Sequence, residues 1–200
     1  MPPAVRPFAL ALVFSALVFA AASLEPYFAG DVGLARLIQA VSPGTEWASA
    51  ITSVATAPGK FVVILAAVAL AYWLGGWKAA AVAAGAIALE QAGAEATKLI
   101  ARRPRPSREL IAVVGNPAGF SFPSTFTTFV AVTFGTVWLL ARQSRRNAAP
   151  IIASVTAMVI VLGWAARVAL GAHWPSDVVL TTLVCMTWLW ATVRVVAPRG

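Results

Sequence analysis

Charged residues are scarce in this 200-residue chain, where they make up 11% of the total. A soluble domain carries roughly 25% charged residues, and its helices have a polar face that long stretches of this sequence lack. Hydrophobic residues account for 60% of the chain. The shortage of charge therefore excludes an ordinary soluble domain and predicts an integral membrane protein.

Cysteine and histidine occur once each, as Cys185 and His173. A single cysteine cannot form an intramolecular disulfide, and one Cys with one His excludes a metal cluster built from these residue types. Cys185 lies within an apolar run and is interpreted as a small structural residue.

Acidic residues are also few, at 7 against 15 Lys and Arg, so the net charge is +8. The basic residues lie in loops between apolar segments, which disfavours nucleic acid as a partner. An anionic membrane surface or an anionic substrate fits better. No feature of the sequence specifies an oligomeric state.

Six apolar segments approach the roughly 20 residues that cross a bilayer. They cover residues 7–24, 61–74, 77–99, 124–141, 151–170 and 177–196. Because five more follow, the first is interpreted as a retained helix and not as a signal peptide. The second is short, and we expect it to begin near Trp47, with a kink at Pro58 and Gly59.

The segment of residues 25–46 has apolar residues at helical spacing, which predicts a short amphipathic helix on the membrane surface. These residues are Leu34, Leu37, Ile38 and Val41. The predicted fold is all-α: a polytopic bundle of about six transmembrane helices plus this interfacial helix, in a single domain over residues 1–200.

Basic residues predict the orientation. One side of the bundle carries Arg6, Lys78, Arg142, Arg145, Arg146, Arg194 and Arg199. The positive-inside rule assigns this side and both termini to the cytoplasm, which implies a plasma-membrane protein. The loop between the third and fourth spans breaks the rule, because it places four arginines and Lys98 on the outer side. This cluster indicates an anion-binding site.

Two segments on that outer side carry groups suited to phosphate. Lys98 offers a point charge at a helix end, and Arg105 offers a planar fork that can bind two phosphate oxygens. Ser124 and Thr125 begin a helix, where free N–H groups and the positive end of the dipole attract anions. Taken alone, Lys98 also fits snorkelling to the interface, and Ser124 fits an ordinary N-cap.

A third segment brings His173 together with two charged residues. Asp177 follows four residues later, a spacing that allows a carboxylate to hold one ring nitrogen and leave the other free. Arg167 lies near the end of an apolar span, where an unpaired charge is costly and is a functional candidate by default. The three segments fall on one face of a six-span topology.

Together these residues resemble the type 2 phosphatidic acid phosphatase family, whose signature is Lys-x6-Arg-Pro, then Pro-Ser, then Arg-x5-His-x3-Asp. The matching residues are Lys98, Arg105, Pro106, Pro123, Ser124, Arg167, His173 and Asp177. The resemblance covers nearly the whole chain. It implies that His173 is the nucleophile of a phosphohistidine mechanism and that Asp177 orients it. It further implies that neither metal nor cofactor is needed and that phosphate is bound by Lys98, Arg105, Ser124, Thr125 and Arg167.

The chain departs from that family at Phe126, where a second histidine usually serves as the general acid. General acid catalysis contributes roughly 10²–10⁴-fold, and its loss matters least for a good leaving group such as a phosphate monoester, whose second pKa is about 6. We therefore predict a lipid phosphatase acting at the outer face on a lipid phosphate or diphosphate, with polyprenyl diphosphate favoured. Glu109, in the arginine-rich loop, is a candidate proton donor.

Two other functions fit parts of this pattern. A family member that binds lipid phosphate without cleaving it would keep the cations, although it would not need Asp177 beside His173. A transporter would need charged residues at mid-membrane. The spans of this sequence lack such residues except for Glu90 and Glu95. Glu95 is placed to pair with Lys98 on one helix face.

Overall fold

The computed structural model describes residues 4–196, and within that range the chain forms seven α-helices. They are α1 (Arg6–Leu24), α2 (Asp31–Val41), α3 (Glu46–Ser53), α4 (Gly59–Ala101), α5 (Thr125–Gln143), α6 (Ala149–Ala169) and α7 (Pro175–Val196). Five of them, namely α1, α4, α5, α6 and α7, are long and apolar enough to cross a membrane.

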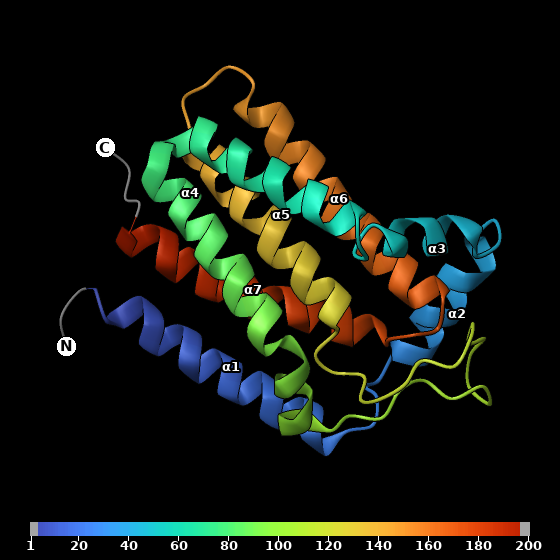
Figure 1. The fold of residues 1–200 in the computed structure, drawn as a ribbon. Coiled ribbons are helices and arrows are strands. Elements are labelled where there is room, and N and C mark those ends of the chain that lie inside the picture. Colours follow the sequence, from blue (N-terminus) through green and yellow to red (C-terminus); the bar gives the residue numbers. More distant parts are fainter. Residues whose placement is uncertain (1–3, 197–200) are drawn as a thin grey trace.

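Helix α4 supplies two of the predicted spans. Its backbone leaves helical geometry at Gly76, with φ 73° and ψ −165°, a conformation that a residue with a Cβ atom rarely adopts. Residues 59–75 and residues 77–101 consequently form two arms that run in opposite directions (Figure 1). The predicted all-α bundle with about six spanning segments is confirmed.

The predicted start of the second span is wrong. Residues near Trp47 form a separate helix, α3, and the spanning arm begins only at Gly59. The last turns of α3 tighten, with the N–H groups of Val54 and Ala55 bonded to carbonyls three residues back. Pro58 then has no N–H to donate to a continuing helix, so the chain ends one helix and begins another.

The predicted interfacial helix corresponds to α2. Ala35 is buried on the side facing the protein, whereas Leu34, Leu37 and Val41 are exposed. Arg36 and Gln39 anchor the helix, because their side chains donate to the carbonyls of Leu110 and Ala112 in the loop after α4. Helix α2 is thereby fastened to the loops that surround the candidate site.

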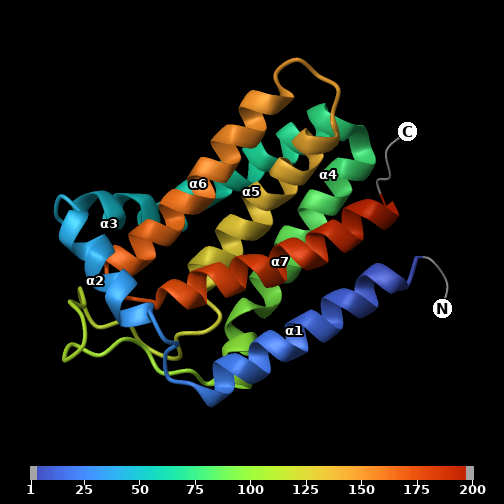
Figure 2. The same cartoon turned by 180° about the vertical axis from the view of Figure 1, so that it is seen from behind.

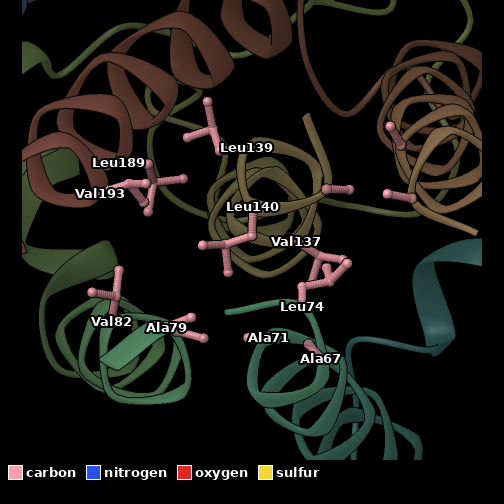
Figure 3. Close-up of a cluster of buried hydrophobic side chains, with 14 residues drawn as sticks. Ala67, Ala71, Leu74, Ala79, Val82, Val137, Leu139, Leu140, Leu189 and Val193 are labelled. Atoms are coloured by element: carbon pink, nitrogen blue, oxygen red, sulfur yellow. The ribbon is translucent and has the colours of Figure 1, made fainter. Parts of the chain in front are cut away.

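Helix α5 lies at the centre of the bundle. Figure 3 shows Val137 and Leu140 of α5 surrounded by Leu74 of the first arm of α4, Val82 of the second arm and Leu189 of α7. Small residues such as Ala71 and Ala79 allow the arms of α4 to approach this helix closely.

The connecting segments divide between two ends of the bundle. Helix α1 begins and α7 ends at the end that also holds the turn between the two arms of α4 and the link between α5 and α6 (Figures 1 and 2). The opposite end holds α2, α3, the long loop of residues 102–124 and the turn between α6 and α7. All three motif segments reach this second end.

Candidate active site

The three motif segments meet in one place. Lys98 at the end of α4, Ser124 at the start of α5 and His173 between α6 and α7 are all buried, with 6%, 0% and 1% of their surfaces exposed. Burial of so many polar groups requires that each finds a partner. The partners reveal how the site is arranged.

His173 is held in a defined orientation. Its Nδ1 lies 2.8 Å from the carbonyl oxygen of Ser121, and because a carbonyl can only accept, Nδ1 carries the proton. Its Nε2 therefore presents a lone pair, and Nη1 of Arg105 lies 3.3 Å from it. A fixed tautomer with an unprotonated Nε2 is the arrangement that a nucleophilic histidine needs.

The turn before His173 depends on Gly171. This glycine has φ +62°, and a Cβ atom at its position would overlap the carbonyl oxygen of Ala112. The neighbouring Leu170 accepts a hydrogen bond from the N–H of Val114 at 2.9 Å. The loop after α4 therefore packs directly on the turn that carries the histidine.

Burial and nearby cations keep the imidazole neutral. Loss of hydration is the largest cause lowering the pKa of His173 well below its usual 6.5, and the positive charges of Arg167, Arg105 and Lys98 lower that pKa further. A neutral ring keeps its Nε2 lone pair available at physiological pH.

Asp177 positions His173 through neighbouring residues and makes no direct hydrogen bond to it. Its Oδ2 lies 3.9 Å from Nδ1 of His173, beyond hydrogen-bond distance. The same oxygen accepts from the Trp174 N–H at 2.9 Å and from the Ser121 hydroxyl at 2.5 Å. Asp177 thus holds Ser121, whose carbonyl fixes the ring, and Trp174, the residue next to the histidine.

Arg103 was not identified from the sequence, although it has the most enclosed charge in the loop. Its side chain is 0% exposed and lies 2.5 Å from Asp177 and 3.3 Å from Asp31. It also donates to the Ser176 hydroxyl at 2.9 Å and to the Glu25 carbonyl at 3.0 Å. The four partners come from α2, α7 and the end of α1, so no local pattern in the sequence indicates this ionic cluster.

Arg105 faces the histidine with most of its donors already fixed. Its Nε donates to the carbonyls of Ala118 and Gly119 at 3.0 and 3.2 Å, and Nη1 donates to the carbonyl of Ala172 at 2.6 Å. Burial lowers the pKa of Arg105, with partial compensation from Asp177. A guanidinium anchored to the backbone is preorganised for an anion.

Arg167 is the cation with spare bonding capacity. Its Nε is buried and has no hydrogen-bond partner among the described residues. The guanidinium lies 5.6 Å from the centre of the Phe126 ring, at cation–π range. The Phe126 ring therefore packs on the guanidinium that would contact a bound phosphate.

Lys98, Ser124 and Thr125 complete the set. Lys98 pairs with Glu95 at 3.1 Å. Ser124 is the N-cap of α5, where its Oγ accepts from the Thr127 N–H at 3.3 Å. Thr125 begins the helix and is half-buried. Ser124 therefore makes an ordinary cap, and the anion-binding role predicted for the start of α5 stays a prediction.

A polar cleft of about 410 Å³ borders these residues. Arg167, Thr125 and Phe126 line one side of it, and the other lining residues are Thr52, Ala55, Lys60, Glu90, Gln91, Ala92, Ala94, Glu95 and Phe129. Glu109, by contrast, is exposed and lines a separate depression with Arg36 and Arg108. The carboxyl groups that line this cleft, those of Glu90 and Glu95, therefore belong to α4.

Comparisons with known proteins identify the family and the fold of this chain. Residues 62–200 match the family model of the PAP2 superfamily. The chain is 41% identical over 103 residues to a decaprenylphosphoryl-5-phosphoribose phosphatase of Mycolicibacterium smegmatis, a match that covers 50% of this chain and 49% of that protein. The chain thus spans about half the length of this curated relative.

A solved structure shares the fold. A transmembrane PAP2-type phosphatidylglycerolphosphate phosphatase from Bacillus subtilis superposes with a TM-score of 0.66 at 17% identity. The superposition covers 96% of this chain and 94% of that chain.

Proposed function

The chain belongs to the PAP2 superfamily, as its motifs predict, and we propose that it is an integral membrane phosphatase that removes phosphate from a polyprenyl-linked lipid. The observation that carries this proposal is the state of His173. Its Nδ1 proton is held by the Ser121 carbonyl, and its Nε2 faces the guanidinium of Arg105.

The reaction proceeds in two displacements. Nε2 of His173 attacks phosphorus, an N–P bond forms, and the bond from phosphorus to the leaving oxygen breaks. The Nδ1 proton stays on the ring and is stabilised by the Ser121 carbonyl while the ring carries positive charge. Water then attacks phosphorus, the N–P bond breaks, and inorganic phosphate leaves with the neutral histidine restored.

Fixed cations stabilise the charge that develops on the phosphoryl oxygens. Arg105 and Arg167 flank the position of the phosphoryl group, and the unpartnered Nε of Arg167 gives it a donor to spare. Lys98 exchanges its contact with Glu95 for a phosphate oxygen. Preorganised charges of this kind supply most of the rate enhancement in phosphoryl transfer.

The relative and the leaving-group argument support different lipid substrates. Phe126 in place of a general acid favours a diphosphate, because a phosphate leaves without prior protonation. The relative's name refers to a phosphate on a decaprenyl-linked ribose, where the leaving group is an alcohol. Both share a polyprenyl chain and a terminal phosphate, and that common part defines the proposed substrate class.

The proposed placement is in the plasma membrane, with both termini in the cytoplasm and the site at the outer face. Basic residues at the end of the bundle opposite the site, including Lys78, Arg142 and Arg194, support this orientation. Residues 1–3 and 197–200, which include Arg199, lie outside the described range.

Phosphate release by the purified protein in detergent tests the proposal. The substrates are farnesyl diphosphate, decaprenylphosphoryl-5-phosphoribose and phosphatidic acid. We expect release from a polyprenyl substrate that is abolished in His173→Ala and retained in the control Arg142→Ala at the far end of the bundle. Quenching with base should trap an acid-labile phosphohistidine in the wild type only.

The assay also distinguishes a lipid-phosphate-binding protein from a phosphatase. If all three lipids bind and none is cleaved, while Phe126→His releases phosphate, then the chain binds lipid phosphate without hydrolysing it. Release that persists in His173→Ala would contradict the assigned nucleophile.

A further inference from the structure

The polar cleft beside Arg167 is larger than phosphate binding requires. Its far wall holds Glu90, Gln91 and Glu95 on the second arm of α4, and Lys60 at the start of the first arm. None of these residues belongs to the three phosphate motifs. At about 410 Å³ the cleft falls within the range of small-molecule sites.

One charged group in this wall, Glu90, is buried and therefore costly, whereas the Glu95 side chain is 75% exposed. Glu90 has only 9% of its surface exposed, and it forms no ion pair with a described residue; its neighbour Gln91 donates to it. Ionisable residues within membrane-spanning helices usually serve a ligand or a pathway. Lys60, which lies 5.3 Å from the centre of the Phe129 ring, also has no carboxylate within ion-pair distance in the described range.

The donor set of the cleft matches hydroxyl groups. Carboxylates accept hydrogen bonds from hydroxyls, an amide both donates and accepts, and an ammonium donates. Two positive residues, Lys60 and Arg167, balance two negative residues, Glu90 and Glu95. A second phosphate placed here would face the carboxylates of Glu90 and Glu95, whereas the hydroxyls of an uncharged polyol can donate to them and accept from Lys60.

The cleft also adjoins the phosphate site. Arg167 and Thr125 line the cleft and belong to the phosphate-binding set. Glu95 lies on the cleft wall and contacts Lys98 at 3.1 Å. Whatever is bonded to a phosphate held by Lys98 and Arg167 is therefore adjacent to Glu95 and the cleft.

We infer that this cleft binds the group to which the scissile phosphate is attached, and that it selects an uncharged, hydroxyl-rich group such as a sugar ring over a second phosphate. The inference rests on the proposed function, because it assumes that phosphate occupies the site beside His173. It makes Glu90 and Glu95 determinants of substrate specificity.

Direct binding tests the cleft separately from catalysis. Calorimetry on His173→Ala protein in detergent would compare ribose 5-phosphate with inorganic phosphate, so that no turnover intervenes. We expect ribose 5-phosphate to bind at least about tenfold more tightly, since hydrogen bonds to charged groups are the stronger ones. In a His173→Ala background, Glu90→Gln should remove most of that difference and leave phosphate binding unchanged. Glu95→Gln should also reduce the difference, but it should tighten phosphate binding because it releases Lys98 from its ion pair.

Glu109→Gln is the matched control, because Glu109 lines a depression separate from the cleft and so is not positioned for the proton-donor role that the sequence suggested. In the active protein, Glu90→Gln should raise KM for decaprenylphosphoryl-5-phosphoribose and leave or improve the use of farnesyl diphosphate. Equal affinity for ribose 5-phosphate and phosphate, or a variant that weakens both equally, overturns the inference. Absence of phosphate release from every lipid overturns the proposed function instead and leaves the binding comparison valid.

Discussion

Replacing Arg103 with methionine should destabilise the protein severely. The guanidinium is fully enclosed and lies 2.5 Å from Asp177 and 3.3 Å from Asp31, whose side chains are 0% and 4% exposed. Removing one partner from a buried ion pair costs about 3–5 kcal/mol, because the remaining carboxylate charge is left without compensation. Here two carboxylates lose their cation, so the upper part of that range applies.

Thermal unfolding in detergent measures the effect. With the scaling of roughly 2–4 °C per kcal/mol that holds for soluble domains of this size, Arg103→Met should lower Tm by about 10–20 °C. The exposed neighbour Arg102 is the control, and Arg102→Met should stay within about 0.5 kcal/mol of the wild type. Adding Asp31→Asn to Arg103→Met should recover part of the loss, since one uncompensated charge is removed.

The kcat of the folded variant distinguishes a purely structural role of Arg103 from a role in positioning His173. Because Asp177 holds Ser121 and Trp174 beside the histidine, Arg103→Met protein that is kept folded at low temperature should still show a lower kcat at similar KM. The reasoning is refuted if Arg103→Met melts within about 1 kcal/mol of the wild type, or if kcat is unchanged while Tm falls.

Three further predictions concern the site. Phe126→His places an acid beside Arg167 and should raise kcat for an alcohol leaving group by roughly 10²-fold, with a much smaller gain for farnesyl diphosphate; equal gains on both substrates would contradict the leaving-group argument. Because the pKa of His173 is lowered on folding, the unfolded chain binds the proton first, so stability is complete above pH about 6.5 and is lost as pH falls toward the folded pKa; Tm measured from pH 8 to pH 5 should decline less in His173→Gln. Gly171→Ala forces a Cβ atom against the Ala112 carbonyl at a positive φ and should lower both Tm and kcat, and a variant with wild-type values would show that the loop does not need this close contact.

The spanning helices and the three motifs could be predicted from the sequence because both depend on local patterns. Apolar runs near the length of a bilayer identify helices without knowledge of their neighbours. The order of Lys98, Ser124 and His173 along alternating loops placed all three at one end of the bundle, and the structure brings them together there. The beginning of the second span was predicted wrongly. The composition of the segment after Trp47 fits one kinked helix as well as it fits two helices separated before Pro58.

Contacts between residues far apart in the chain were decided only by the tertiary structure. Four-residue spacing suggested that Asp177 would hold His173, yet the Ser121 carbonyl, from another loop, accepts the hydrogen bond from Nδ1–H. In the sequence, Arg103 has no feature that distinguishes it from the other three loop arginines. In the structure it is the one that pairs with both Asp31 and Asp177. Glu90 became part of a polar cleft only when α3, α4, α5 and α6 packed together. The reason is physical: hydrogen bonds and ion pairs depend on atoms within a few ångströms, and the packing of helices determines which atoms those are.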